Sequence, residues 1–157
     1  MINETIVNEN RKETQTISKP RKNKKMGIRP TAAFIGAAWV SLGIGLISYC
    51  IGLWNADMLL NEKGYYFTII LFGLFSAISV QKCVRDKAED IPVTDIYYGL
   101  SWFTTIASIV LLVIGLRNAD LELSEKGFYG MSFTLAMFSS IAVQKNTRDI
   151  KLIDSED

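Results

Sequence analysis

Acidic and amide side chains are concentrated in two short segments of nearly the same sequence. Their members are Asn55, Asp57, Glu62, Asn118, Asp120, Glu122 and Glu125. Hard divalent cations prefer oxygen ligands, so one interpretation is a cation site where the two segments meet. The other is local structure, because a carboxylate suits a helix N-terminus and asparagine suits the end of a helix. On that interpretation Asn61 and Ser124 are the predicted N-cap residues.

A second pair of segments combines amides with charges of both signs. Its members are Gln81, Lys82, Arg85 and Asp86, and then Gln144, Lys145, Arg148 and Asp149. Residues four apart share one face of a helix, which predicts the ion pairs Lys82–Asp86 and Lys145–Asp149. These lysines can also reach lipid headgroups from the end of a membrane span. The alternative is that the segments form a docking surface for a cytosolic partner or for anionic lipid.

The residue inventory excludes several chemistries. The chain has 0 histidines, which removes histidine-based zinc sites, Ser-His triads and imidazole acid–base catalysis. Its two cysteines, Cys50 and Cys83, are predicted on opposite sides of a membrane, beyond the reach of a disulfide. We therefore predict no catalytic residues, no cofactor, no metal ligands apart from the cation alternative, no nucleic-acid partner and no enzymatic activity.

Four uncharged stretches must position these segments. They are residues 30–56, 64–81, 96–116 and 127–144. Each has the length of about 17–25 residues that a helix needs to cross the hydrocarbon core of a bilayer. This pattern excludes a soluble globular domain and predicts an all-α polytopic membrane protein with four transmembrane helices.

The distribution of positive charge predicts the orientation of those helices. With both termini and the connection between the second and third spans inside, 14 basic residues lie inside and 3 outside. Cytoplasmic segments carry an excess of Lys and Arg, so both termini are predicted to be cytoplasmic. The basic cluster from Lys19 to Arg29 is either a topology signal alone or also a contact with anionic lipid headgroups.

The chain contains an internal repeat that appears when it is shifted by 63 positions. GLWNAD at 52–57 matches GLRNAD at 115–120, and EKGYY at 62–66 matches EKGFY at 125–129. The second match pairs Lys63 and Gly64 with Lys126 and Gly127. Each repeat holds two spans, which predicts two tandem helical hairpins related by an axis along the membrane normal.

The predicted organisation has four parts. They are a disordered basic cytoplasmic tail at 1–30, a first two-helix repeat at 31–87, a second at 94–150, and an acidic C-terminal tail at 151–157.

The repeated motifs also carry a family resemblance. GLWNAD with NEKGYY and GLRNAD with SEKGFYG, each followed by a QK-x-x-RD ending, resemble the bacterial YiaA/YiaB family, built on the YiaAB two-helix domain. The resemblance covers about residues 33–150 and implies a four-helix, multi-pass protein of the bacterial inner membrane, with no established biochemical activity. Two departures are the longer basic tail and Arg117, which stands where the first repeat has Trp54.

Small residues within the spans predict close helix packing. In the first span the stripe is Ala37, Ser41, Gly45, Ser48 and Gly52. Such residues let helix backbones approach each other in lipid. The alternative is a solute pathway lined by Ser101, Thr104, Thr105 and Ser108. The aromatic side chains Trp54, Tyr65, Tyr66, Phe128 and Tyr129 are predicted to form an interfacial belt.

We therefore predict a structural or interaction role within the membrane. The alternative is a small transporter or channel-like protein that acts as a homo-oligomer. Membrane lipids are the predicted partners in either case.

Overall fold

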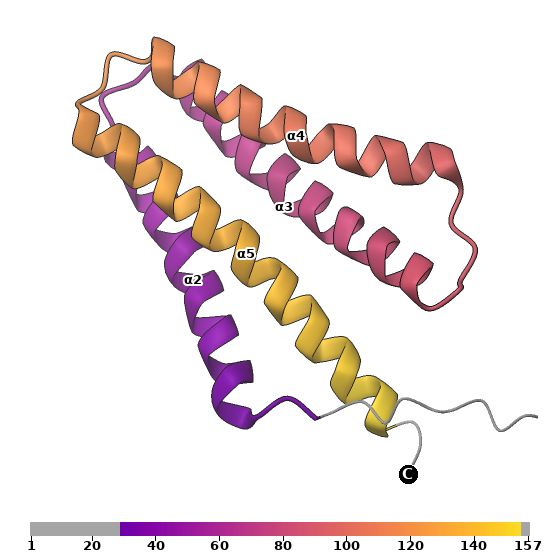
Figure 1. The fold of residues 1–157 in the computed structure, drawn as a ribbon. Coiled ribbons are helices and arrows are strands. Elements are labelled where there is room, and N and C mark those ends of the chain that lie inside the picture. The colour runs from indigo at the N-terminus through magenta and orange to yellow at the C-terminus, as the bar shows by residue number, and fades with distance from the viewer. Residues whose placement is uncertain (1–28, 155–157) are drawn as a thin grey trace, which may run out of the picture.

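The computed structural model describes residues 29–154, which fold into four long helices joined by short connections (Figure 1). The helices are α2 (Ala32–Asn55), α3 (Leu60–Ala88), α4 (Asp95–Asn118) and α5 (Leu123–Asp154). The all-helical prediction is confirmed. Helix α4 begins and ends 63 residues after α2, and α5 begins 63 residues after α3. The basic cluster of the tail lies outside the described residues except for Arg29, and so do residues 155–157.

Matched polar contacts set the helix boundaries in both repeats. The side-chain amides of Asn55 and Asn118 donate to the carbonyls of Ile51 and Ile114, at 3.0 and 2.9 Å, where α2 and α4 end. The predicted N-caps at Asn61 and Ser124 are wrong. Helix α3 begins at Leu60 and α5 at Leu123, so both predicted caps lie inside the helices. The carboxylates of Glu62 and Glu125 instead accept from the backbone amides of Leu59 and Glu122, just before each helix.

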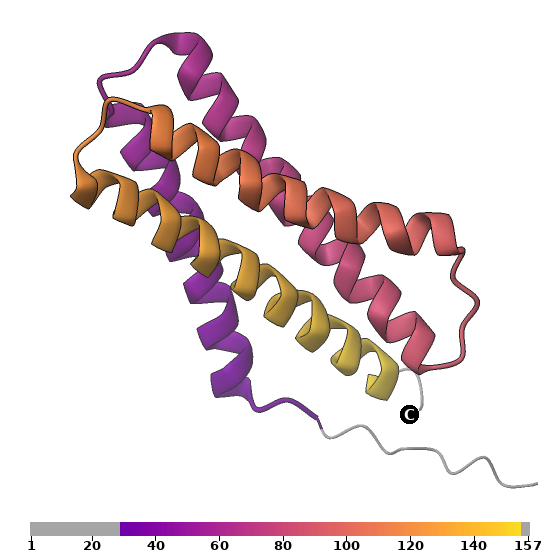
Figure 2. The same ribbon diagram turned by 45° about the horizontal axis from the view of Figure 1, so that its top comes forward.

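The helices pair across the two repeats rather than within them. Helix α2 runs beside α5, and α3 runs beside α4, while α3 and α5 form the junction between these pairs (Figures 1 and 2). The two helices of each repeat have few contacts with each other. The repeats are therefore hairpins in connectivity only, and each completes its packing with helices of the other.

All four helices contribute to one hydrophobic core. Its members are Tyr49, Leu53, Tyr66, Ile69, Ile70, Leu112, Leu116, Tyr129, Phe133 and Ala136. Tyr66 and Tyr129 are equivalent in the repeats, and their rings stack with centroids 6.0 Å apart. The belt prediction is wrong for these two residues, since both are only 3% exposed. Trp54 is 84% exposed, so its place in the belt stays a prediction.

The close approach of α2 to α5 depends on a glycine. A Cβ atom on Gly45 would lie 2.8 Å from the backbone nitrogen of Ala136, a distance that real Cβ atoms essentially never show. The predicted small-residue stripe is correct at this position. It is wrong at Ala37, which is exposed, because Ala38 occupies the buried face instead.

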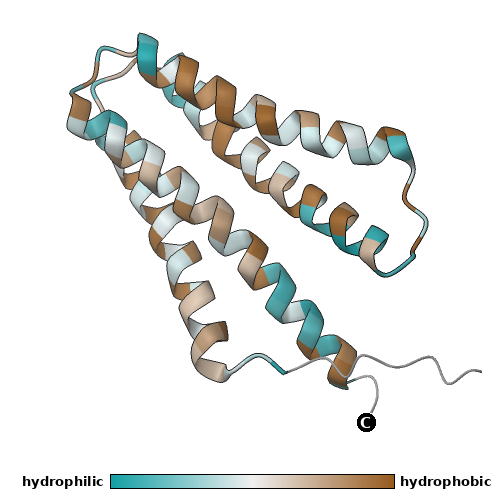
Figure 3. Ribbon diagram, in the orientation of Figure 1, coloured by the Kyte–Doolittle hydropathy of each residue, from teal (hydrophilic) through white to brown (hydrophobic). Residues whose placement is uncertain are grey.

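The exterior of the helices is strongly apolar. Helices α2, α3 and α4 are long and apolar enough to cross a membrane. Helix α5 does not reach the same hydropathy, because Ser132, Ser139, Ser140 and Gln144 dilute its uncharged stretch. Figure 3 shows that its C-terminal part is largely hydrophilic.

The end of the bundle that holds the 56–59 and 119–122 connections is called the hairpin end here, and the opposite end the terminal end. At the terminal end, the predicted pair Lys145–Asp149 is confirmed at 3.5 Å. The predicted pair Lys82–Asp86 is wrong, because the largely buried Asp86 accepts from its neighbour Arg85 at 2.7 Å. Arg148 pairs with Glu89 and so ties α5 to the end of α3.

Candidate functional site

Two of the cavities at the hairpin end are related by the 63-residue repeat, one between α3 and α4 and one between α2 and α5. The α3–α4 cavity has a volume of about 390 Å³ and is lined by Asp57, Met58, Asn61, Glu62, Tyr65, Tyr66, Gly115, Asn118, Ala119, Asp120 and Leu121. The α2–α5 cavity has a volume of about 320 Å³ and is lined by Gly52, Asn55, Ala56, Ser124, Glu125, Phe128 and Tyr129. All seven lining positions of the second cavity recur in the first, 63 residues away. The repeat therefore builds the same recess twice.

A glutamate stands at the mouth of each cavity. One carboxylate oxygen of Glu62 accepts from the backbone amide of Leu59 at 2.9 Å, and Glu125 accepts from that of Glu122 at 2.9 Å. These contacts fix each carboxylate at a helix N-terminus, where the helix dipole favours negative charge. The second oxygen of each carboxylate remains available to a ligand.

Asparagine supplies the facing wall. The amide nitrogens of Asn55 and Asn118 are already bonded to their own helices. Their side-chain oxygens accept no hydrogen bond from another described residue. Both predicted local roles, the carboxylates at helix N-termini and the asparagines at helix ends, are thus confirmed.

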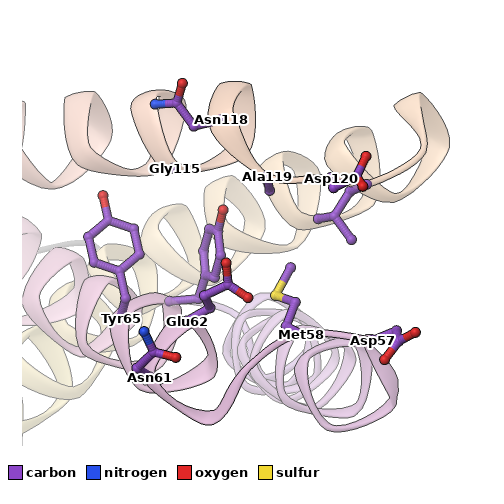
Figure 4. A pocket seen from close by; sticks show the side chains of 11 residues that line it. Asp57, Met58, Asn61, Glu62, Tyr65, Gly115, Asn118, Ala119 and Asp120 are labelled. Atoms are coloured by element: carbon purple, nitrogen blue, oxygen red, sulfur yellow. The ribbon is translucent and has the colours of Figure 1, made fainter.

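Aromatic rings form the floor of each cavity, where they pack over a glycine of the facing helix. A Cβ atom on Gly115 would lie 2.7 Å from the Tyr65 ring and 3.1 Å from the Tyr66 hydroxyl oxygen. A Cβ atom on Gly52 would lie 2.7 Å from the Phe128 ring. A Cβ atom at either position would displace these rings, so glycine lets α3 and α5 place them against α4 and α2. Figure 4 shows Tyr65 and Glu62 of α3 facing Gly115 and Ala119 across the α3–α4 cavity.

The repeated acids are only partly brought together. Asp57 and Asp120 line the same α3–α4 cavity, whereas Glu62 and Glu125 line different cavities. Within residues 29–154, no group of three or more His, Cys, Asp or Glu side chains is arranged to hold a metal ion. The geometry therefore does not support the cation alternative.

The remaining repeated residues of the hairpin end lie outside these two cavities, although Lys63 and Gly64 line a third pocket between α2 and α3. Lys63 donates from Nζ to the carbonyl of Trp54 at 2.9 Å and so joins α3 to the end of α2. A Cβ atom on Gly64 or Gly127 would meet nothing within 4 Å, so packing does not require glycine at either position. Lys126 lines neither cavity.

Near the terminal end, the interior holds polar atoms with no hydrogen-bond partner within the described chain. They are Oε1 of Gln81, Oε1 of Gln144, Oγ of Ser139, and both amide atoms of Asn146. Gln81 and Gln144 were predicted as repeated residues, whereas Asn146 and Ser139 were not. The hydroxyls of the predicted solute pathway differ from these, because each donates to a carbonyl of its own helix.

Sequence reasoning missed the aromatic and glycine residues of the cavities. The sequence pattern indicates an interfacial belt for Tyr65, Tyr66, Phe128 and Tyr129, and a packing role alone for Gly52. Their repetition at a separation of 63 residues was visible, but which helix each ring would cover was not.

Comparisons with known proteins agree with this architecture. The model of the yiaA/B two helix domain matches the chain twice, at residues 34–86 and 97–149. The inner membrane protein YiaA of Escherichia coli (strain K12) is 56% identical over 117 residues, which cover 74% of this chain and 81% of that protein. Inner membrane protein YiaB of the same organism is 25% identical over 98 residues, covering 62% and 83%.

A shorter relative matches about one repeat. The uncharacterized membrane protein YubF of Bacillus subtilis (strain 168) is 46% identical over 63 residues, which cover 40% of this chain and 72% of that protein. No solved structure matches the chain. The relatives' names describe membrane proteins and name no biochemical activity. With two domain matches and this level of identity, the chain is a membrane protein that belongs to the YiaAB two-helix-domain family.

Proposed function

We propose that this protein has a structural or interaction role in the bacterial inner membrane and no catalytic activity. The observation that carries the proposal is the core that joins all four helices directly beneath the two cavities. Tyr49 is 0% exposed, Ile70 1% and Phe133 2%, and the stacked rings of Tyr66 and Tyr129 lie among them. Side chains packed at this density leave no room for a solute to pass through that level of the bundle.

The membrane arrangement belongs to the same proposal. Helix α5 crosses the membrane with the other three, because it lies alongside α2 and its backbone approaches α2 closely at Gly45. Both termini are cytoplasmic, in accordance with the distribution of basic residues.

Site-specific photo-crosslinking in native membranes tests the interaction role. A photoreactive residue is introduced at Phe75 or Phe138, which are 70% and 69% exposed on the apolar exterior, and at the buried Tyr49 as a control. We expect the exposed positions to form discrete protein adducts, with a second copy of this chain or with another membrane protein. The buried position should crosslink only within the chain. Adducts to lipid alone at both exposed positions would contradict the proposal.

The second candidate is a small transporter or channel-like protein that acts as an oligomer. The unpartnered polar atoms of Gln81, Gln144 and Asn146 favour it, because such groups are costly inside a membrane unless water or a solute satisfies them. Reconstitution into liposomes separates the candidates. Solute leakage above that of protein-free vesicles, abolished by Asn146→Leu, supports transport, and leakage equal to that of protein-free vesicles supports the structural role.

A further inference from the structure

We propose that each of the two hairpin-end cavities binds a primary ammonium group, carried either by an aminophospholipid headgroup or by a free small amine. The proposal goes beyond a structural role, because it assigns a ligand class to the recess that the repeat builds twice.

The first step is the acceptor set. Each cavity is lined by a glutamate, Glu62 or Glu125, and an asparagine, Asn118 or Asn55, and each of these side chains keeps one oxygen without a hydrogen bond in the described chain. Their remaining polar atoms are already bonded to backbone groups. A ligand with several N–H donors matches such a set, whereas an anion or a ligand with acceptors alone does not.

The second step is a pair of largely buried tyrosines whose hydroxyls have no hydrogen-bond partner within the described chain. Tyr66 lines the α3–α4 cavity and Tyr129 the α2–α5 cavity, and both residues are only 3% exposed. Neither hydroxyl has a hydrogen-bond partner among the described residues, although Tyr49 and Tyr65 use theirs to bond backbone carbonyls. These hydroxyls are not among the fully buried unpartnered atoms, so each is accessible from the cavity that its tyrosine lines and can accept a hydrogen bond from a ligand. Because Glu62 and Tyr66 are four residues apart, as are Glu125 and Tyr129, both groups lie on one face of their helix.

The third step is charge. No lysine or arginine lines either cavity, and the α3–α4 cavity has three carboxylates, from Asp57, Glu62 and Asp120. The aromatic faces on the floor also attract cations through their ring quadrupoles. Charge, hydrogen-bonding capacity and aromatic surface therefore favour the same ligand class.

The fourth step is position. The cavities open at the end of the apolar helices, beside exposed apolar residues such as Trp54, Leu60 and Leu123. That depth corresponds to the boundary where a lipid headgroup and a water-soluble amine both have access.

Thermal unfolding of the full chain in nanodiscs tests the lipid source. Nanodiscs of phosphatidylglycerol are supplemented with phosphatidylethanolamine or, as the matched control, with N-acylated phosphatidylethanolamine, which lacks the ammonium charge. Calorimetric titration in detergent with ethanolamine, against ethylene glycol as the uncharged control, tests the free amine. Stabilisation by phosphatidylethanolamine alone assigns the lipid source, and binding of ethanolamine assigns the free amine. If neither the lipid nor the amine exceeds its control, the proposal is overturned.

Variants that preserve the fold then locate the site. Glu62→Gln with Glu125→Gln keeps an oxygen for the helix-start contact but removes the charge, and it should weaken binding by about tenfold or more. Tyr66→Phe with Tyr129→Phe should weaken binding in the same direction, since neither hydroxyl is used within the described fold. Glu122→Gln is the matched control, because it removes a carboxylate from the same loop but lines neither cavity. Equal weakening by Glu122→Gln, or full binding by the glutamate pair variant, would overturn the assignment.

Discussion

The Tyr49 side chain joins three helices, because its hydroxyl bonds α3 of the same repeat and its ring contacts α5 of the other. Its hydroxyl donates to the carbonyl of Tyr66 at 3.0 Å, and its ring meets Tyr129 edge to face with centroids 5.4 Å apart. The residue is 0% exposed, so the hydroxyl has no access to water. The contact thus fixes α2 against both α3 and α5 at the centre of the core.

We expect Tyr49→Phe to lower the free energy of unfolding by about 0.5–1.5 kcal/mol, the usual net value of one hydrogen bond. The ring and its aromatic contacts are retained, so packing should change little. Chemical unfolding in detergent measures the effect, with the exposed Tyr97→Phe as the control. Equal stability of the two variants would show that the Tyr49 hydroxyl contributes nothing.

At the scale of the elements, the two glycines of α2 near its middle have different roles. Gly45 faces the backbone of Ala136, whereas a Cβ atom on Gly43 would meet nothing within 4 Å. Helix α2 therefore owes its approach to α5 to one glycine, and the other is replaceable.

Replacing each glycine by alanine should change the free energy of unfolding in opposite directions. Gly45→Ala forces the backbones apart, and we expect a loss of about 1–3 kcal/mol in the free energy of unfolding. Gly43→Ala adds helix propensity without a clash, and we expect a gain of up to about 1 kcal/mol. Melting temperatures measured in detergent report both changes in stability. A neutral Gly45→Ala would show that α2 and α5 are separated further than the structure has them.

The connection after α3 contains a position whose backbone conformation favours glycine. Asp90 has a φ of 57°, in the left-handed region, and follows the helix at the start of the 89–94 connection. We expect Asp90→Gly to raise the free energy of unfolding by about 0.5–1 kcal/mol, because glycine adopts this conformation without a Cβ penalty. Asp90→Ala is the matched control and should destabilise. The same chemical unfolding in detergent measures both, and a destabilising Asp90→Gly would contradict the argument.

At the scale of the molecule, cross-repeat pairing makes the two halves dependent on each other. Helices α2 and α3 have little contact with each other and bury their faces against α5 and α4. One repeat alone would leave those faces uncovered. Two copies of a single repeat could form the same arrangement.

Cleavage between the repeats should therefore leave the molecule assembled. With a protease site inserted in the exposed 89–94 connection, we expect the two fragments to co-elute in mild detergent after cleavage. Size-exclusion chromatography followed by denaturing electrophoresis is the measurement, and uncleaved protein is the reference. Separate elution of the fragments would show that the cross-repeat contacts are too weak to hold the halves together.

Orientation is a second property of the whole molecule. We expect a cysteine introduced at Ser124, in a chain without Cys50 and Cys83, to react with a membrane-impermeant reagent in intact cells. Such labelling would place the hairpin end on the side of the membrane away from the cytoplasm, as the distribution of basic residues predicts. If only permeant reagents label Ser124, the orientation is reversed.

The sequence alone determined the helices, their repeat and their membrane character. Uncharged stretches of membrane-spanning length and a repeat of 63 positions are local or linear features, and they predicted four helices, although α3 and α5 extend several residues beyond the predicted stretches 64–81 and 127–144. The asparagines at the helix ends were also predictable, because their hydrogen bonds go to residues four positions away.

Only the tertiary structure decided which helices pair and what lies between them. Two hairpins can pack internally or exchange partners with the same hydrophobic pattern, since in lipid every apolar face is equally acceptable. Partner choice depends on shape, such as Gly45 against Ala136 and the aromatic rings over Gly52 and Gly115. For the same reason Tyr66 and Tyr129 resembled belt residues in the sequence but form the centre of the core and the floor of the two cavities.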